Sequence, residues 1–373
     1  MAGIYVHIPF CARRCIYCGF YSTVRESEAA RYVNALCREL ELRRDYLNGA
    51  SVTTLYFGGG TPSRLTPDRI EQVIDCVRTV FGLSSLIELT VECNPDDITS
   101  DYIAALRQLG VNRISMGVQT FNDDLLRFLG RRHTSRQAVD AVGICRQCGI
   151  QNISIDLMYG LPGQTTRIQQ NDLLTAADLQ VQHISSYCLS FEENSTLYSM
   201  RLDNRISPVD DDTCAAMYDS MCCHLRNAGF EHYEISNFCR PGFHSRHNSS
   251  YWDGTPYLGV GAGAHSYNGQ TRQWNPNNLD AYMTAIEQET PAFQIERLTP
   301  TDLYNEKIML SLRTAHGLDL QILSASDRLS LLESAQSLLL NGNLLLADNH
   351  LSIPESRMFI SDSIISTLFK TDA

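Results

Sequence analysis

The sequence predicts an α/β protein in which residues 1–206 form a partial (β/α)6, TIM-like barrel. Six short runs rich in β-forming residues alternate with segments of helical periodicity, and this alternation favours a parallel sheet with helices as its crossovers. An open, doubly wound sheet would show the same alternation. The barrel is favoured because cysteine, glycine and polar residues fall at or near the C-terminal ends of these runs, which meet at one mouth of a barrel.

The β-like runs are short, and helical segments separate them. The runs cover residues 4–8, 53–57, 87–92, 113–118, 152–157 and 183–189. The helical segments cover residues 27–46, 68–81, 100–109, 123–129, 135–148 and 166–179. Ser27 can cap the first helix, and Thr66-Pro67 gives the second a cap followed by a proline in the first turn. These units together account for the barrel.

The alternation lapses after residue 206, and two further regions follow. Residues 207–298 form a mixed region that opens with a helix over 209–227 and then carries a histidine-rich and a glycine-rich segment. Residues 299–373 contain two expected helices, near 301–314 and 326–340, and a small hairpin over 344–346 and 351–353. This arrangement resembles a winged helix. We expect a packing or lid domain, because the charge of the chain does not suit DNA binding.

Composition limits the classes of function. The net charge of −12 argues against a free nucleic-acid-binding protein, which needs a basic face. A hydrophobic fraction of 43% is enough for a large core. No apolar run reaches membrane-spanning length, and no charged-then-apolar leader precedes Cys11. The sequence therefore predicts a soluble, cytoplasmic protein that associates with membranes only through its partners.

Most of the thirteen cysteines are expected to be reduced in that compartment. Four of them are interpreted as core packing: Cys37, Cys76, Cys93 and Cys188. Two pairs lie in helix-like stretches, namely Cys145 with Cys148 and Cys222 with Cys223. Packing is the simpler interpretation of these pairs, and a redox or metal role stays open.

Three cysteines directly after the first β-like run carry the strongest chemical signal. Cys11, Cys15 and Cys18 lie on a loop that Pro9 separates from the strand. A structural zinc ion is usually bound by four protein ligands, and an ordinary ferredoxin cluster is bound by four cysteines. Three thiolates suit a [4Fe-4S] cluster that leaves one iron open. Their spacing, with Tyr17 as the aromatic residue before the third cysteine, resembles the signature of radical S-adenosylmethionine (SAM) proteins, in which SAM occupies the open iron.

A glycine motif ends the second β-like run. The segment from Gly58 to Pro62 lacks the lysine and the spacing of a phosphate loop. Consecutive glycines instead allow the backbone to approach a ligand closely. In radical SAM proteins such a motif meets the amino group of SAM, and Gly59, Gly60 and Thr61 match it.

Polar residues near the ends of later runs complete the set that the resemblance implies. They are expected to hold the ribose, amine and carboxylate of SAM through charged hydrogen bonds, and they are Glu92, Gln119, Arg131 and Asp156. Arg131 is the natural partner of a carboxylate. Arg132 beside it offers the same chemistry, so the choice between the two arginines stays open.

Longer motifs resemble the oxygen-independent coproporphyrinogen oxidase family of radical SAM proteins. They are Tyr5-x-His7-Ile8-Pro9-Phe10-Cys11, Phe57 to Pro62, Met116-Gly117-Val118-Gln119-Thr120-Phe121-Asn122 and Asp156-Leu157-Met158-Tyr159-Gly160-Leu161-Pro162. The first motif adds Tyr5 to the residues implied to bind SAM. The sequence departs at two points from the decarboxylating enzymes of this family, and at both points it resembles the HemW group of haem chaperones. Phe20 follows Gly19 where those enzymes have a fourth cysteine, and the cluster strand begins almost at Met1.

A segment in the mixed region supports the same group. His247-Asn248-Ser249-Ser250-Tyr251-Trp252 is similar, residue for residue, to the His-Asn-x-x-Tyr-Trp haem-binding motif of the HemW group. The resemblance implies haem binding by His247, Asn248, Tyr251 and Trp252. A neutral imidazole can bind iron, and the two aromatic side chains offer flat apolar surface to a porphyrin.

These resemblances predict a haem chaperone that binds a [4Fe-4S] cluster, SAM and haem and delivers haem to haemoproteins such as respiratory enzymes. The cluster is implied to promote homodimerisation and transfer, and no catalytic residue is assigned. The alternative is an oxygen-independent coproporphyrinogen III oxidase, which uses SAM for oxidative decarboxylation to protoporphyrinogen IX. The SAM residues fit both functions, whereas Phe20 and the segment from His247 to Trp252 favour the chaperone.

Overall fold

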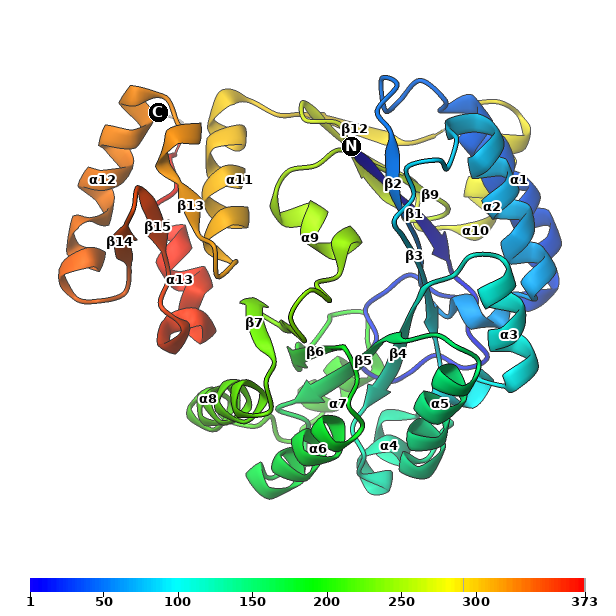
Figure 1. The fold of residues 1–373 in the computed structure, drawn as a ribbon, viewed down its shortest axis with the longest axis horizontal. Coiled ribbons are helices and arrows are strands. Elements are labelled where there is room, and N and C mark those ends of the chain that lie inside the picture. Colours follow the sequence, from blue (N-terminus) through cyan, green and yellow to red (C-terminus); the bar gives the residue numbers. More distant parts are fainter. Residues whose placement is uncertain (291, 372–373) are drawn as a thin grey trace.

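The computed structural model describes residues 1–290 and 292–371, and its centre is a twelve-stranded sheet. Six strands that follow one another in sequence, β1 to β6, form the middle of this sheet and pair in parallel. They curve into a half-barrel with helices along its outer side (Figure 1). The predicted α/β fold with a parallel sheet is thus confirmed.

The strands and helices of the half-barrel lie close to their predicted positions. The strands are β1 (Ala2–Ile8), β2 (Val52–Gly59), β3 (Glu88–Cys93), β4 (Arg113–Gln119), β5 (Asn152–Tyr159) and β6 (His183–Cys188). The helices are α1 (Ala29–Leu42), α2 (Pro67–Phe81), α3 (Ser100–Gln108), α4 (Asp123–Leu129), α5 (Ser135–Gln147) and α6 (Thr166–Asp178). The expected Ser27 cap is wrong, because Ser27 lies in a short 3-10 turn and Glu28 precedes α1.

Alternation of side chains along the strands separates an apolar outer layer from a polar lumen. On β1, Ile4, Val6 and Ile8 belong to the buried core under the helices, whereas Tyr5 and His7 point to the opposite face of the sheet. A parallel sheet that is covered on one side by helices must bury its apolar residues on that side. The lumen is therefore where the polar side chains of β1 to β6 gather.

Residues 207–298 do not form a separate body, because their strands extend both edges of the same sheet. β9 (Tyr257–Val260) pairs in parallel with β1, and antiparallel strands continue outward from it as β10 (His265–Tyr267), β11 (Thr271–Trp274) and β12 (Gln294–Arg297). At the other edge β8 (Asn237–Cys239) and β7 (Glu231–Glu234) follow β6. α7 (Thr196–Leu202) precedes this part of the chain, whose helices are α8 (Asp211–Asn227), α9 (Arg246–Trp252) and α10 (Leu279–Glu287).

A buried carboxylate fixes the β9–β11 extension to α1. The Glu39 side chain is 1% exposed and pairs with Arg43 at 3.1 Å. It accepts hydrogen bonds from the Gly261 amide at 2.8 Å, the Tyr282 hydroxyl at 2.7 Å and the Asn275 side chain at 2.8 Å. A buried charge is tolerated when it is paired and fully hydrogen-bonded in this way.

The last part of the chain packs against the β7 edge. It contains α11 (Pro300–Leu312), β13 (Leu318–Asp319), α12 (Ala325–Leu340), β14 (Leu345–Ala347), β15 (His350–Ser352), η5 (Glu355–Ile360) and α13 (Ser361–Ser366). The two predicted helices and the hairpin are present, and the three strands form a sheet in the order β13-β15-β14. Backbone hydrogen bonds from Ala315 to Tyr233 (3.0 Å) and from Ile235 to Arg313 (3.1 Å) join this domain to β7. Its classification as a winged helix stays a prediction.

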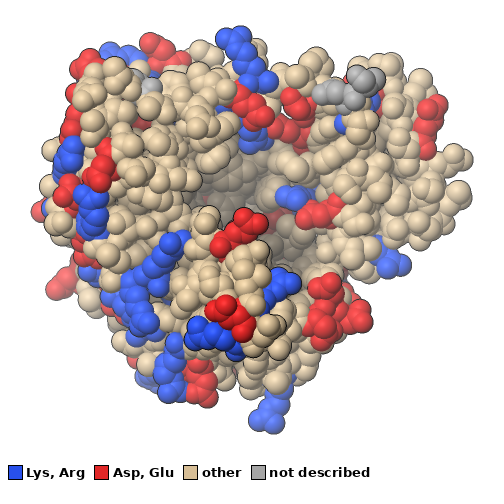
Figure 2. Space-filling model, turned by 180° about the vertical axis from the view of Figure 1, so that it is seen from behind, with Lys and Arg blue, Asp and Glu red and all other residues tan. Residues whose placement is uncertain are grey.

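Cys37 of α1 and Cys76 of α2 form a disulfide, which differs from the expectation that both are reduced core residues. The two helices pack side by side on the outside of the half-barrel, so their facing positions bring the sulfurs together. None of the helices in the described ranges has the length and apolarity needed to cross a bilayer. Seen from behind, the surface is hollowed near its middle, with acidic and basic side chains interspersed around the hollow (Figure 2).

Candidate functional site

The three cysteines lie on the loop that leaves the C-terminal end of β1. Backbone contacts hold both ends of this loop together: the Cys11 amide donates to the Thr23 oxygen at 2.8 Å, and the Thr23 amide donates to the Pro9 oxygen at 2.7 Å. Its middle is fixed to the end of α4, since the Ile16 amide donates to the Leu129 oxygen at 3.3 Å. Backbone contacts therefore position the loop without using the thiols.

A cavity of about 530 Å³ opens at the C-terminal ends of the strands. It is lined by the three cysteines and by nearly all residues implied to bind SAM, namely Cys11, Cys15, Tyr17, Cys18, Gly59, Gly60, Thr61, Glu92, Gln119, Arg131 and Asp156. Tyr5 does not line it but stacks on Tyr56 deeper in the lumen, with 6.0 Å between ring centroids. Phe20, which stands where a fourth cysteine would be in the decarboxylating enzymes, lines the rim and is 69% exposed.

The three thiols lie within electrostatic reach of one another. Burial raises the pKa of Cys11 and Cys18, and a negative charge on Cys15 raises the pKa of both further. The Cys11 sulfur lies 3.3 Å from the Thr61 hydroxyl, and an Arg131 nitrogen lies 3.6 Å from the Cys15 sulfur. Three free thiols on one cavity beside a guanidinium that offsets their charge fit a [4Fe-4S] cluster with one open iron.

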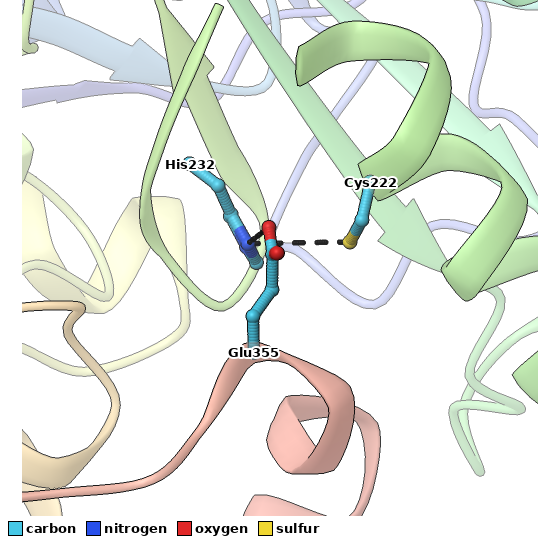
Figure 3. A group of neighbouring side chains, drawn as sticks. All are labelled: Cys222, His232 and Glu355. Atoms are coloured by element: carbon cyan, nitrogen blue, oxygen red, sulfur yellow. Dashed lines mark hydrogen bonds and ion pairs between the residues drawn. The ribbon is translucent and has the colours of Figure 1, made fainter. Parts of the chain in front are cut away.

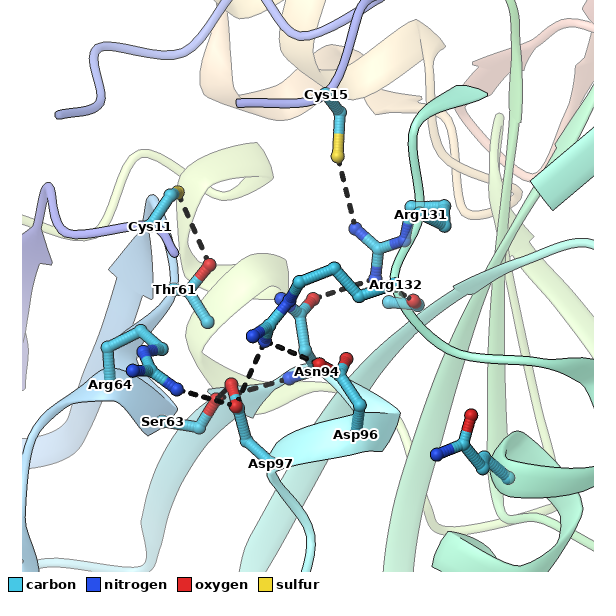
Figure 4. A network of polar contacts seen from close by, with 12 residues as sticks. Cys11, Cys15, Thr61, Ser63, Arg64, Asn94, Asp96, Asp97, Arg131 and Arg132 are labelled. Atoms are coloured by element: carbon cyan, nitrogen blue, oxygen red, sulfur yellow. Dashed lines mark hydrogen bonds and ion pairs between the residues drawn. The ribbon is translucent and has the colours of Figure 1, made fainter. Parts of the chain in front are cut away.

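The structure distinguishes the two neighbouring arginines (Figure 4). Arg131 lines the cavity, where it donates to the Asn94 side chain at 2.7 Å and to the Gly117 oxygen at 2.5 Å. Its Nε is buried and has no hydrogen-bond partner among the described residues. Arg132 instead pairs with Asp96 and with Asp97. Arg131 therefore presents its guanidinium to the cavity, where a carboxylate ligand could meet it, whereas Arg132 is used within the protein.

Two buried carboxyls face the cavity from β3 and β5. Burial raises the pKa of Glu92 to about 7, and the nearby charge of Asp156 contributes to this rise. Burial also raises the pKa of Asp156 to about 6. Glu92 accepts a hydrogen bond from the Tyr56 hydroxyl at 2.7 Å and from the Gly59 amide at 3.1 Å. Such a pair suits a ligand that brings its own positive charge, as the amine and sulfonium of SAM would.

The backbone around the cavity is unusual at two positions. Gly60 lies against the end of β1, so closely that a Cβ on it would be 2.8 Å from the Pro9 carbonyl. Gln119 has a φ of 70°, at a point where the pairing of β4 with β5 shifts register after Gly117. A non-glycine residue in the left-handed region costs energy and is often found at binding sites. Both features bring polar backbone and side-chain groups into the cavity.

The segment implied to bind haem lies inside the half-barrel as helix α9. His247 is 1% exposed, and burial lowers its pKa to about 3. Its Nδ1 lies 2.8 Å from the Thr54 hydroxyl, and its Nε2 lies 2.9 Å from the Tyr251 hydroxyl. Asn248 and Trp252, like Tyr251, are half-buried. This arrangement does not fit a haem, because both ring nitrogens are occupied and iron could reach Nε2 only after the Tyr251 hydroxyl is displaced.

His247 does not line the cavity but lies behind it, deeper in the lumen. Its ring stacks on Tyr56 with 5.0 Å between centroids and an angle of 23°, and the Tyr56 hydroxyl holds Glu92. The two carboxylate oxygens of Glu88 accept the backbone amides of Arg246 and His247, each at 2.9 Å. The start of α9 is therefore anchored to β3. A chain of contacts leads from α9 through one tyrosine to a residue that lines the cavity.

The residues that carry this chain of contacts are not among those predicted from the sequence. Thr54, Tyr56 and Glu88 all face the lumen on β2 and β3. A signal was present in the sequence. Each of the three is polar or amphipathic and lies an even number of residues from another lumen residue of the same strand, as Glu88 does from Glu92. What no local pattern revealed is that a helix from residues 246–252 would fill the space between them.

Comparisons with known proteins agree with this geometry. The model of the radical SAM superfamily matches residues 5–170. The heme chaperone HemW of Bacillus subtilis (strain 168) is 36% identical over 320 residues, which cover 85% of this chain and 84% of that protein. The heme chaperone HemW of Mycobacterium tuberculosis (strain ATCC 25618 / H37Rv) is 35% identical over 375 residues, which cover 98% of this chain and 94% of that protein.

A solved structure shows the same fold over nearly the whole chain. Coproporphyrinogen III oxidase (HemN) from Escherichia coli, a radical SAM enzyme, superposes with a TM-score of 0.86 at 24% sequence identity, covering 99% of this chain and 90% of that chain. At that identity the likeness concerns the fold, whereas the curated relatives are similar enough in sequence and coverage to define the family. The cysteine loop, the cavity residues and the extent of the match to these relatives lead to one assignment: the chain belongs to the HemW family of the radical SAM superfamily.

Proposed function

We propose that the chain is a haem chaperone that binds a [4Fe-4S] cluster and SAM at the mouth of the half-barrel. The observation that carries this proposal is the convergence of Cys11, Cys15 and Cys18 with the SAM residues on one cavity, in a chain whose relatives are named heme chaperones. The proposal includes transfer of haem to haemoproteins such as respiratory enzymes, and a homodimer that depends on the cluster.

Each wall of the cavity has a role in this proposal. The three cysteines would hold the cluster, which supplies an open iron for the amine and carboxylate of SAM. Arg131 would receive the carboxylate with its guanidinium, which lines the cavity. Glu92 and Asp156 would pair with the positive groups of SAM, while the amides of the glycine motif approach it without side chains in the way.

Haem carriage is proposed for the chain as a whole, and the iron ligand is left to experiment. His247 is buried with both ring nitrogens hydrogen-bonded, so loss of haem in a His247 variant would not by itself identify a ligand. Binding of SAM and of the cluster must be followed in the same variant. A ligand role changes haem binding alone, whereas a role in supporting Tyr56 and Glu92 behind the cavity changes SAM binding without any haem.

The test of the proposed function uses the full chain under anaerobic conditions. The cluster is reconstituted, haem is added, and the Soret absorbance that co-elutes with protein on gel filtration is measured together with the elution volume. The matched variant is Cys15→Ser, which should lose the cluster and, with it, the dimer. In parallel, coproporphyrinogen III and SAM are supplied and porphyrin products are assayed.

The outcomes separate the chaperone from the oxidase. Haem that stays with the parent protein and passes to an apo-haemoprotein, with no porphyrin product, supports the chaperone. Turnover of coproporphyrinogen without stable haem would overturn the proposal and make the chain an oxidase. The exposed Phe20 in place of a fourth cysteine at the rim is the structural feature that favours the first outcome.

A further inference from the structure

Three side chains from distant parts of the sequence meet where the C-terminal domain packs on the edge of the barrel. Cys222 comes from α8, His232 from β7 and Glu355 from the start of η5. Their sulfur, nitrogen and oxygen atoms all lie within 4.8 Å of one another (Figure 3). Cys222 is buried and the His232 side chain is 8% exposed, whereas the Glu355 side chain is 35% exposed, so the group has one side open to solvent.

The distances are close to those that a small metal ion requires. His232 Nδ1 lies 3.1 Å from Glu355 Oε1 and 4.0 Å from Cys222 Sγ. Ligands at the bond lengths of tetrahedral zinc would be about 3.3–3.7 Å apart. The two distances from His232 Nδ1 differ from these spacings by a few tenths of an ångström, whereas Cys222 Sγ and the Glu355 carboxylate lie within 4.8 Å and would approach by side-chain rotation. The group would then form a three-ligand site with a fourth position for water.

The atoms around the group hold its ligands in the orientation that metal binding needs. The His232 ring stacks on Phe238, with 4.3 Å between centroids and an angle of 12°, which fixes its plane. Its Nε2 faces the Ile235 carbonyl at 3.4 Å, so an N–H there can donate and leave Nδ1 free for a metal. Arg226 pairs with Glu355 Oε2, which leaves Oε1 directed at His232.

We propose that Cys222, His232 and Glu355 bind a divalent transition-metal ion, with Zn²⁺ as the preferred ion, and that this ion fastens the C-terminal domain to the barrel. A mixed sulfur, nitrogen and oxygen donor set suits zinc better than magnesium or calcium, which prefer oxygen alone. Binding replaces the thiol proton of Cys222, which passes to solvent, while neutral His232 keeps its one ring proton on Nε2 and offers Nδ1 to the metal. The site is separate from the proposed cluster site and does not depend on the haem proposal.

The experiment loads the cluster first, so that Cys11, Cys15 and Cys18 are occupied and do not capture zinc. The holoprotein then receives one equivalent of ZnCl₂, is desalted, and its zinc and iron are measured by elemental analysis. We expect about one zinc per chain in the parent protein. Cys222→Ser and Glu355→Gln should each weaken zinc retention at least tenfold while the iron content stays unchanged.

Two controls make the result specific. Cys223→Ser changes the neighbouring exposed cysteine of α8 and should retain zinc like the parent. His244→Gln changes a second group in which Glu231, Cys239 and His244 come together near the same hairpin, and it should also retain zinc. Loss of zinc in His244→Gln alone would assign the ion to that second group and overturn the proposal.

A second measurement reports on the role in fastening the domain. Zinc should raise the melting temperature of the parent and slow hydrogen exchange over residues 355–360, and neither effect should occur in Cys222→Ser. Glu355→Gln keeps the shape of the side chain, so it remains informative if the buried cysteine variant folds poorly. A parent protein that retains no zinc, or variants that retain as much as the parent, would refute the site.

Discussion

Glu92 shows how burial prepares a single side chain for a cationic ligand. Its pKa is raised to about 7 by burial, so the carboxyl gains a proton as the pH falls through 7. We expect SAM binding to the cluster-loaded chain to weaken between pH 8 and pH 6, by up to about tenfold per pH unit below the pKa. Calorimetric titration at each pH measures this.

The control for that prediction is Glu92→Gln. This variant should bind SAM more weakly at pH 8 and show a flatter profile between pH 8 and pH 6, because the group that titrates there is gone. An unchanged slope in the variant would mean that another group titrates. Asp156, with a pKa of about 6, is the neighbour whose effect would then have to be measured.

His247 gives the second prediction at this scale. His247→Ala removes a buried ring and two hydrogen bonds, to Thr54 and Tyr251, so we expect the free energy of unfolding to fall by about 2–4 kcal/mol. Urea denaturation without haem measures this. The matched control is Arg246→Ala, an exposed position on the same helix, which should change stability by less than about 0.5 kcal/mol. Unchanged stability in the His247 variant would contradict a structural role behind the cavity.

The residue scale also shows what sequence can and cannot predict about the site. Cys11, Cys15 and Cys18 were placed correctly on a loop after β1, because their spacing and the proline before them are local properties. The position of His247 in the lumen could not be predicted from the sequence. His247 belongs to a segment that is distant in sequence from β2 and β3 but packs against both strands. Local spacing carries no information about such packing.

At the scale of elements, Glu39 is the side chain that holds α1 to the sheet extension. Glu39→Ala leaves Arg43 buried without its partner and leaves the Gly261 amide unpaired. We expect a loss of about 3–5 kcal/mol in the free energy of unfolding. Chemical denaturation checks this, with Glu41→Ala, a partly exposed position of the same helix, as the control. A loss in the Glu39 variant no greater than in the control would show that the network contributes little.

The disulfide between α1 and α2 gives a second prediction for elements. It closes a segment with a sequence separation of 39, for which the chain-entropy model gives about 4 kcal/mol. We expect a reducing agent to lower the free energy of unfolding of the parent by about 2–4 kcal/mol. Cys37→Ala should be insensitive to the reductant. Mass spectrometry of the non-reduced peptides tests the bond itself, and free thiols at both positions would contradict it.

Prediction of the elements succeeded where hydrophobic periodicity is strong. The strands β1 to β6 and their helices were located correctly because each buries an apolar face that repeats in the local sequence. The edge strands were not located as part of the sheet. β12, for example, is exposed at all of its residues, so its state is set by pairing with β11 and not by an apolar pattern.

At the scale of the whole molecule, stability should decrease from the centre of the sheet to its edges. β1 to β6 are flanked by strands on both sides, whereas β12 is an outer strand with exposed residues. We expect the amides of β12 to exchange with solvent about a thousandfold faster than those of β4. Hydrogen exchange followed by mass spectrometry measures this, and equal protection of the two strands would contradict a gradient.

The pairing of β1 has a consequence for how the chain matures on the ribosome. β1 lies between β2 and β9, so one of its neighbours is made early and the other only after residue 257 has emerged. Until then the first strand is an open edge, and the cysteine loop at its end is attached to an incomplete sheet. Non-local pairing of this kind is slow to form. Iron and sulfide that arrive during synthesis would therefore reach the cysteine loop more easily than they would in the finished protein.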